Sequence, residues 1–367
     1  MTRRDAADWV NALVRADVRA TAAYHVADAR GMVKLDAMEN PFALPAQLQS
    51  LLGERVATAA LNRYPDPQAR ALSASIRSTF GIDPRWGILL GNGSDEIIQM
   101  LIAGVSGPGC CVLAPAPSFV MFRLISQWLN VRFEEVTLRS DFQLDVPAMR
   151  EAIRLHRPRL IFLACPNNPT GNLFDEASLR AVLEAADALV VIDEAYLAFA
   201  SRDHTALLDE YPNLLIMRTL SKLGLAALRL GYLIGDPRWI AEFDKIRLPY
   251  NIGTLNQVAA EVALEHFDVL DAQTRLIVSE RARLLVRLQA DARLHCWQSE
   301  ANFLLVRPHE ASARTVHAGM ARRGVLVKCL DGGHPLLANC LRLTIGAPAE
   351  NDAMLAALDA ELAAQSQ

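Results

Sequence analysis

Four short polar motifs in this 367-residue chain each follow or end an apolar stretch that is typical of a strand. The stretches are residues 86–90, 160–165, 189–193 and 214–219, and their motifs are Gly91-Asn92-Gly93-Ser94, Asn167-Asn168-Pro169-Thr170-Gly171, Asp193-Glu194-Ala195-Tyr196 and Ser221-Lys222. Parallel strands bring their carboxyl ends to one edge of a sheet, where such folds bind ligands. The shared position therefore predicts that the four motifs meet in one site.

Strand-like and helix-like stretches alternate along the chain from about residue 70. Strands are expected at residues 86–90, 110–114, 132–136, 160–165, 189–193, 214–219 and 228–234, and helices at 94–105, 146–155, 175–187 and 238–246. This alternation predicts an α/β fold with a largely parallel sheet between helices.

The rest of the chain predicts a smaller α+β domain and an N-terminal arm. Residues 255–293 are mostly helical in pattern and form a plausible connector. Strands are then expected at 302–307, 325–328 and 340–345, and a closing helix at 351–364. Residues 1–35 are expected to form an amphipathic helix followed by an arm.

Composition excludes several classes of protein. Apolar residues make up 52% of the chain and charged residues 21%, which allows a large core, and the length suggests about two domains. The net charge of −4 lacks the basic footprint of a nucleic-acid-binding protein. The longest apolar stretches, such as residues 110–121, contain prolines and are too short to span a bilayer. The N-terminus has no uninterrupted apolar segment typical of a signal peptide.

The six cysteines indicate neither a metal site nor a disulfide framework. They form no CxxC pair, and no His/Cys cluster has the spacing of zinc ligands. Free thiols in a reducing compartment are expected, so we expect a cytoplasmic protein without a bound metal.

Lys222 and Asp193 carry the strongest chemical indication. An amine forms a Schiff base only when it is deprotonated part of the time, which requires partial desolvation or nearby cations. Lys222 lies just past an apolar run, beside Ser221 and seven residues before Arg229. Asp193 ends another apolar run, where a carboxylate needs a partner, and Tyr196 follows three residues later. A protonated pyridine nitrogen would be such a partner, so these residues predict a site for pyridoxal 5′-phosphate (PLP).

The loop at residues 91–94 is compatible with a phosphate site at a helix start. Glycines let the backbone approach a ligand, and the free N–H groups of the first helical turn attract a phosphate. Alternatively, Ser94 is a plain N-cap, or the loop belongs to a dinucleotide-binding dehydrogenase. The dinucleotide pattern lacks a third glycine in register, and a dehydrogenase would leave Lys222 and Asp193 without roles.

Together these motifs resemble the fold-type I PLP-dependent aminotransferases of class I and II, and within them the histidinol-phosphate aminotransferase family. The resemblance covers nearly the whole chain and includes four further strings: KLDAMENPF at residues 34–42, NRYPD at 62–66, SEANF at 299–303 and CLRLTIG at 340–346. It implies a large domain with a mostly parallel seven-stranded sheet between helices, plus a smaller α+β domain. The expected division is residues 1–48 for the arm and part of the small domain, 49–255 for the PLP-binding domain and 256–367 for the small domain.

The resemblance also implies roles for individual residues. Lys222 would form the Schiff base and shuttle a proton, Asp193 would pair with the pyridine nitrogen, and Tyr196 would tune the cofactor. The full set expected around PLP is Ser94, Asp95, Phe119, Asn168, Asp193, Tyr196, Ser221, Lys222 and Arg229, with Tyr64 supplied by the neighbouring subunit of a homodimer. The substrate would be bound by Tyr24, Asn40, Lys328 and Arg342.

The implied reaction converts L-histidinol phosphate and 2-oxoglutarate into imidazole-acetol phosphate and glutamate, in histidine biosynthesis. Two alternatives stay open: an aminotransferase for aromatic or other amino acids, and a PLP decarboxylase of the threonine-phosphate type. Three positions depart from the family pattern and bear on this choice. Phe119 replaces a common Tyr, Lys328 replaces a common Arg, and Lys222 and Arg229 are one residue closer than usual.

Overall fold

The computed structural model describes residues 5–23 and 27–365, in two compact units, residues 1–31 and 32–367. In the first unit, α1 (Ala6–Leu13) begins where the Asp5 carboxylate accepts a hydrogen bond from the Asp8 N–H at 2.8 Å. A short helix, α2 (Ala16–Ala20), follows. Tyr24, an expected substrate residue, lies outside the described residues. Within the described ranges, no helix is long and apolar enough to cross a membrane.

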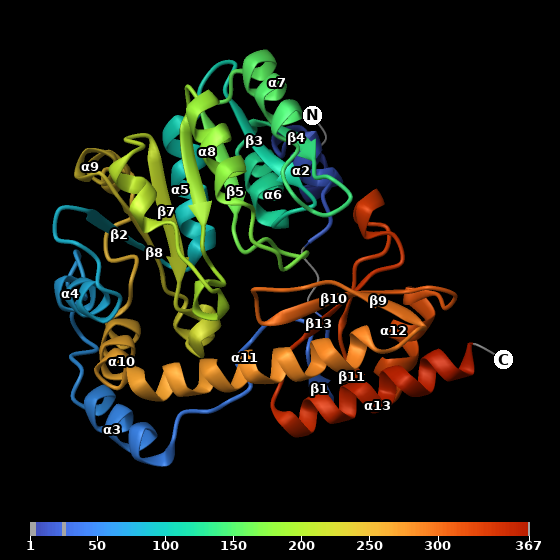
Figure 1. Ribbon diagram of the computed structural model, residues 1–367. Helices are drawn as coiled ribbons and strands as arrows, with labels where there is room; N and C mark the ends of the chain where they lie inside the picture. The colour runs from blue at the N-terminus through green and yellow to red at the C-terminus, as the bar shows by residue number, and fades with distance from the viewer. Residues whose placement is uncertain (1–4, 24–26, 366–367) are drawn as a thin grey trace. The chain divides into compact units, whose positions relative to one another are not determined.

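The second unit contains a seven-stranded sheet with the order β2-β8-β7-β6-β5-β3-β4 (Figure 1). Its strands are β2 (Gly87–Gly91), β3 (Cys111–Ala116), β4 (Arg132–Thr137), β5 (Leu160–Ala164), β6 (Leu189–Asp193), β7 (Leu214–Thr219) and β8 (Gly231–Gly235). All neighbours are parallel except β8, which is antiparallel to both β2 and β7. The expected fold class, with a mostly parallel seven-stranded sheet, is confirmed.

Helices cover both faces of this sheet because its central strands are apolar on both sides. In β6, the side chains of Val190 and Ile192 enter one core, and those of Leu189 and Val191 enter the other. The first core includes α4 (Arg70–Thr79), α7 (Val146–His156), α8 (Glu176–Ala185) and α10 (Thr254–Glu265), and the second includes α5 (Ser94–Val105), α6 (Val120–Trp128) and α9 (Pro237–Asp244). Continuous apolar runs are therefore what a strand buried on both faces requires.

A second, antiparallel sheet has the order β12-β13-β10-β9. Its strands are β9 (Leu294–Cys296), β10 (Phe303–Pro308), β12 (Lys328–Cys329) and β13 (Leu341–Thr344). It shares a core with α11 (Phe267–Gln289), α12 (Ala313–Arg322) and α13 (Pro348–Ala364). This is the expected smaller α+β part of the chain.

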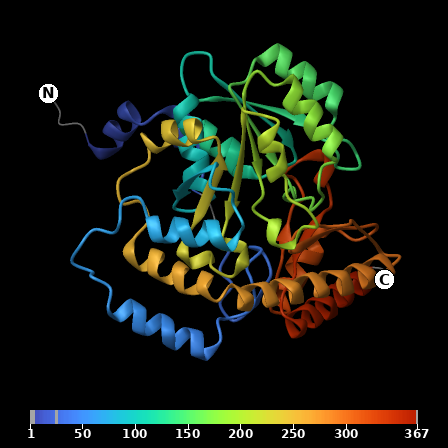
Figure 2. The ribbon, with the colours of Figure 1, turned by 60° about the vertical axis from the view of Figure 1, so that its left-hand side comes forward.

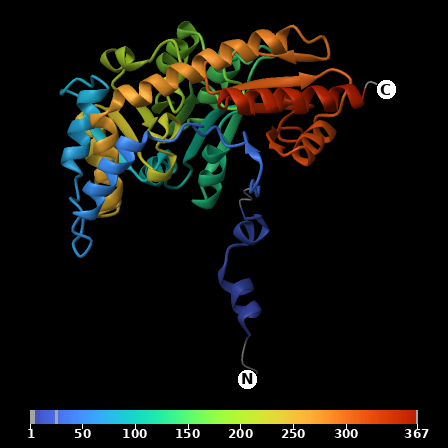
Figure 3. The ribbon, with the colours of Figure 1, turned by 90° about the horizontal axis from the view of Figure 1, so that it is seen from below.

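Two connections join the parts of the second unit. The long helix α11 continues from α10, beside the large sheet, to β9 of the small sheet (Figure 3). Strand β1 (Val33–Lys34) pairs in parallel with β11 (Val325–Leu326). This pair holds the segment that precedes α3 (Ala46–Ala57) beside the chain that enters the small sheet at β12. Helices α3 and α4 both pack beside α10 (Figure 2).

One strand begins later than its sequence pattern indicates. Residues 228–234 were expected to be extended, but β8 starts at Gly231. The preceding Ala226–Leu228 forms a 3₁₀ turn, and Arg229 has a left-handed backbone with φ of 50°. Arg229 therefore lies in a loop before the strand, where its side chain can turn toward α5.

Candidate active site

A cavity of about 110 Å³ lies where β5, β6 and β7 end and α5 begins. Its lining residues are Met38, Ser94, Asp95, Phe119, Ala164, Pro166, Asn168, Asp193, Ala195, Tyr196, Thr219, Ser221, Lys222 and Arg229. Nine of the ten residues expected around PLP are in this lining, and Tyr64 is the exception. The four polar motifs therefore meet at one place, as their positions after strands predict.

Lys222 presents a buried amine whose proton is easily lost. Its Nζ donates to the Ala37 carbonyl at 3.3 Å and lies 5.8 Å from the centre of the Tyr196 ring. Burial, together with the positive charges of Arg342 and Arg229, lowers the pKa of Lys222 to about 8. About a tenth of this amine is thus neutral at pH 7, and the neutral form is the state that attacks a carbonyl.

Asp193 and its neighbour Glu194 are both buried, but of these two only Glu194 forms ion pairs with described residues. The Glu194 carboxylate accepts from Arg218 Nε at 2.8 Å and lies 2.9 Å from the ring nitrogen His204 Nδ1. Asp193 accepts from the Ala195 N–H at 3.0 Å, and among the described residues it forms no ion pair. Burial raises the pKa of Asp193 to about 7. A proton-bearing nitrogen placed beside Asp193 would supply the missing partner.

A series of hydrogen bonds connects the cavity to the small sheet. Asn168 Nδ2 donates to the Tyr196 hydroxyl at 3.0 Å, and Asn168 Oδ1 accepts from Arg342 Nη1 at 2.7 Å. Arg342 also donates to the Asp36 carbonyl at 2.7 Å, and its guanidinium lies over the Phe303 ring. Burial raises the pKa of the Tyr196 phenol, so it remains a protonated donor. Arg342 thus places a buried positive charge next to two residues that line the cavity.

The first turn of α5 and Arg229 form a cradle for an anion. Gly93 precedes the helix with φ of 83°, and a Cβ there would come within 2.6 Å of the Arg229 guanidinium. Arg229 donates to Ser221 Oγ at 3.5 Å and pairs with Asp95 Oδ2 at 3.3 Å. Despite the short spacing after Lys222, Arg229 therefore reaches the helix start, whose free N–H groups favour a phosphate.

The other expected residues are placed around this cavity at different distances. The Phe119 ring lines it and packs edge-on against Phe122. Asn40 Nδ2 donates to the Leu223 carbonyl at 3.2 Å and to Gln273 Oε1 at 3.1 Å, so Asn40 secures the segment that covers Lys222.

Lys328 and Tyr64 do not line the cavity. Lys328 is exposed and lies opposite Arg342 in the β12–β13 pair, so both side chains extend from one face of the small sheet. Tyr64 stacks on Tyr250 with ring centres 4.4 Å apart, at an exposed position.

Sequence reasoning missed Thr219 and the segment at Ala37 and Met38. Thr219 Oγ1 accepts from the Ser221 N–H at 3.1 Å and donates to the Leu230 carbonyl at 2.9 Å, so it shapes the turn before Lys222. Thr219 ends the strand two residues before the Ser221-Lys222 motif, and its hydroxyl was the available signal. The approach of Ala37 to Lys222 joins residues far apart in the chain, and no spacing indicates it.

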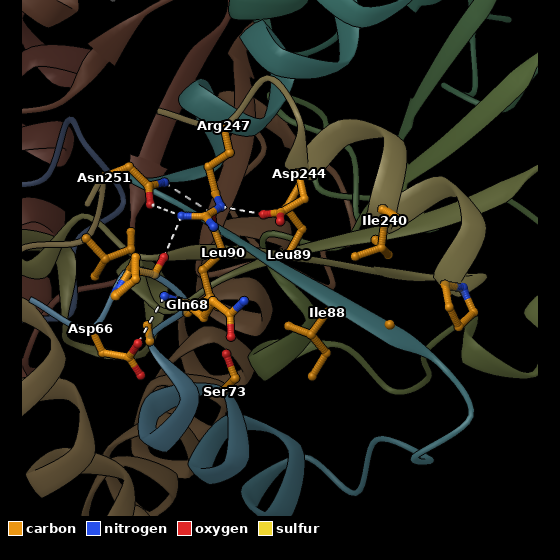
Figure 4. Close-up of a pocket in the computed structure, with 16 residues that line it drawn as sticks. Asp66, Gln68, Ser73, Ile88, Leu89, Leu90, Ile240, Asp244, Arg247 and Asn251 are labelled. Carbon is orange, nitrogen blue, oxygen red and sulfur yellow. Dashed lines mark hydrogen bonds and ion pairs between the residues drawn. The ribbon is translucent and has the colours of Figure 1, made fainter. Parts of the chain in front are cut away.

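A larger cavity, of about 290 Å³, lies elsewhere, between β2, α9 and the start of α4 (Figure 4). Arg247, Asp244 and Asn251 line it and bond to one another. It contains none of the motifs that follow strands, so we assign the chemistry to the smaller cavity. In residues 5–23 and 27–365 no group of His, Cys, Asp and Glu could hold a metal ion.

Comparisons with known proteins agree with this arrangement. Residues 30–358 match the family model of class I and II aminotransferases. A histidinol-phosphate aminotransferase of Ralstonia nicotianae is 49% identical over 97% of this chain and 96% of its own length. One of Nitrosococcus oceani is 48% identical over 98% of this chain and 99% of its own length.

A solved structure extends the likeness to three dimensions. The crystal structure of a histidinol-phosphate aminotransferase from Sinorhizobium meliloti, in complex with pyridoxal 5′-phosphate, superposes with a TM-score of 0.81. The two chains are 28% identical, and the match covers 90% of this chain and 91% of that one.

Proposed function

This chain belongs to the class I and II aminotransferases, and within them to the histidinol-phosphate aminotransferase family, and from that premise we propose its reaction. It transfers an amino group between L-histidinol phosphate and 2-oxoglutarate, giving imidazole-acetol phosphate and glutamate, in histidine biosynthesis. We expect it to act in the cytoplasm, where its six free cysteines would stay reduced.

This proposal rests on one observation: a single cavity holds both a lysine that readily loses its proton and a carboxyl group that has no ion-pair partner among the described residues. Lys222 and Asp193 line one cavity, and burial moves the pKa of Lys222 down to about 8 and that of Asp193 up to about 7. PLP fits both, because its aldehyde reacts with a neutral amine and its pyridine nitrogen gives Asp193 a cationic partner. When bound, PLP supplies an aldehyde that carries the amino group and a ring that stabilises negative charge.

The chain's own residues would then hold and move protons at defined atoms. Lys222 Nζ would take the proton from the substrate Cα and pass it to C4′, the former aldehyde carbon of the cofactor. Asp193 keeps a proton on the ring nitrogen by its negative charge. Tyr196 and Asn168 would hold the phenolic oxygen of the cofactor, and Phe119 would stack on its ring.

The cofactor's phosphate would be held at the cradle. Ser94 and Asp95 offer N–H groups at the start of α5, and Ser221 and Arg229 add a hydroxyl and a guanidinium. Partial burial raises the pKa of Asp95, and the charge of Arg229 opposes that rise. Arg229 therefore offsets the carboxylate that would otherwise repel the phosphate.

Arg342 would bind the anionic group of the substrate. Its fork of N–H donors suits either the carboxylate of glutamate or the phosphate of histidinol phosphate. Lys328 extends from the same face of the small sheet and adds a second positive charge for the phosphate. Asn40 and Tyr24 complete the proposed substrate set, and Asn40 lies within hydrogen-bonding distance of the carbonyl that follows Lys222.

The functional form would be a homodimer in which Tyr64 reaches the phosphate of the partner's cofactor. Tyr64 is 79% exposed and stacks on Tyr250, with exposed Leu61 (73%) and Leu248 (68%) nearby in the chain. An exposed apolar patch of this kind is typical of a protein interface. Co-expressed K222A and Y64A chains would restore activity, since one site of the mixed dimer would keep both side chains. No restoration would exclude a shared site.

The reaction itself is tested with purified protein, PLP, histidinol phosphate and 2-oxoglutarate. We expect glutamate to form, and K222A to lower kcat by about 10²–10⁴-fold, the usual contribution of a general acid–base group. Parallel double-reciprocal plots are expected, because the amino group is transferred in two halves. Release of carbon dioxide from threonine phosphate, without glutamate formation, would identify a decarboxylase instead.

A further inference from the structure

Glu96 restrains the loop of the phosphate cradle, residues 91–94, through hydrogen bonds. Glu96 Oε2 accepts from the backbone N–H of Asn92 at 2.6 Å and from Asn251 Nδ2 at 2.8 Å. Asn251 Nδ2 also donates to the Leu90 carbonyl at 3.2 Å. These bonds fasten the loop at both of its ends to a segment about 155 residues further along the chain.

The anchoring continues into the larger cavity. Asn251 Oδ1 accepts from Arg247 Nη1 at 3.1 Å, and the same Nη1 donates to the Pro67 carbonyl at 2.8 Å. Arg247 Nε donates to Asp244 Oδ1 at 2.7 Å, and Figure 4 shows these side chains turned toward one another. Arg247 thereby fixes the orientation of Asn251, which leaves its amide nitrogen free to donate to Glu96.

The cradle loop needs such an anchor because glycines make it flexible. A Cβ at Gly91 would come within 2.5 Å of Ile97, and Gly93 has a φ of 83°, which L residues rarely adopt, so both positions favour glycine. Glycine loses more conformational freedom on ordering than any other residue. The bond from Asn92 to Glu96 restrains the one residue between the two glycines.

We infer that Glu96 is a positioning residue that holds the cradle loop in the shape that binds the cofactor's phosphate. This inference rests on the proposed function, because it assumes that PLP occupies the smaller cavity. Glu96 acts through an acceptor oxygen and not through its charge, since a carboxylate near a phosphate opposes phosphate binding.

The two effects of Glu96 can be separated by substitution. Glu96→Ala removes both the acceptor and the charge, whereas Glu96→Gln keeps one side-chain oxygen for the Asn92 N–H. E96A loses a hydrogen bond to a charged group, and removal of the carboxylate's repulsion toward the phosphate offsets part of that loss. We therefore predict that E96A binds PLP about tenfold more weakly than the wild type does. E96Q is expected to bind PLP at least as well as the wild type.

The test compares two ligands that differ only in the phosphate. Protein stripped of cofactor is titrated with PLP and with pyridoxal, and dissociation constants are read from the change in absorbance. E96A should weaken PLP binding about tenfold and leave pyridoxal binding unchanged, and N251A should act in the same direction. Glu242→Ala, on exposed α9 where Glu242 pairs with Lys245, is the matched control and should change neither.

Each outcome is decisive. If E96A binds PLP as tightly as the wild type, or loses PLP and pyridoxal equally, the positioning role is wrong. If E96Q is as weak as E96A, the acceptor oxygen is not what matters, and the inference fails. If the wild type itself binds no PLP, the proposed function fails, and that result is distinct from the others.

Discussion

Replacing Lys222 by methionine should stabilise the protein without its cofactor. The pKa of Lys222 falls from 10.5 in the unfolded chain to about 8 in the folded one. At pH values where the folded protein must bind this proton, the shift lowers the free energy of unfolding. Each unit of that difference corresponds to 1.36 kcal/mol, so the upper bound of the gain is about 3 kcal/mol. Methionine has a similar volume and no charge, so the cavity wall should be retained.

The effect has a definite dependence on pH. Between pH 8 and 10.5 the folded protein binds fewer protons at Lys222 than the unfolded chain does, so the wild type gains stability as pH rises. Below pH 8 the full penalty applies. The advantage of K222M should therefore be greatest at pH 7 and should shrink steadily toward pH 10.5.

The assay is urea unfolding of cofactor-free wild type and K222M at pH 7.0 and pH 10, followed by far-UV circular dichroism. Lys245→Met, at an exposed lysine, is the matched control and should change stability by less than about 0.5 kcal/mol. If K222M is no more stable than the wild type at pH 7, or if its advantage is as large at pH 10, the buried-amine reasoning is refuted.

Three further substitutions test the surroundings of Lys222. Glu194→Gln should lower the free energy of unfolding by about 3–5 kcal/mol, because it leaves the Arg218 guanidinium buried without its carboxylate; a loss below 1 kcal/mol in urea unfolding would contradict this. Asp193→Asn should stabilise the cofactor-free protein at pH 8, because the folded wild type there bears a buried carboxylate whose pKa is raised to about 7. The same variant should lower kcat at least about tenfold. A destabilised variant with normal turnover would oppose both expectations. Arg342→Lys should raise KM for glutamate and for histidinol phosphate by roughly tenfold or more, since a point charge replaces a fork, and steady-state assays with unchanged KM would remove Arg342 from the substrate site.

The sequence predicts the parts of the fold that depend on local pattern. The bounds of β6, β7 and α5 coincide with their expected ranges, because β6 and β7 are apolar runs with a polar motif at their end and α5 is a helical run with one at its start. Helices α3, α4, α6 and α12 were not expected. In none of them does a side chain cap the first turn, although Ser312 stands at the N-cap of α12.

The site is predictable to the extent that its residues follow strands. Nine expected cofactor residues line the cavity because the carboxyl ends of β2, β3, β5, β6 and β7 lie at one edge of the sheet. The supporting contacts of Glu194 with Arg218 and of Glu96 with Asn251 depend on tertiary packing between distant segments. No periodicity or spacing encodes them, so only the structure identifies which acid is compensated and which is not.

The expected domain boundaries at residues 48 and 255 remain a proposal. The two sheets occupy residues 87–235 and 294–344, and α11 bridges them. Limited proteolysis of the cofactor-free protein would locate any flexible boundary between them.

The most direct test of the central claim compares four amines in single-turnover reactions. Cofactor-loaded protein is mixed in turn with histidinol phosphate, glutamate, phenylalanine and threonine phosphate, and the loss of the cofactor's visible absorbance is timed. We predict that histidinol phosphate and glutamate both react, with histidinol phosphate the fastest per molar of amine. Faster reaction with phenylalanine or threonine phosphate, or no reaction with histidinol phosphate, would contradict the proposed function.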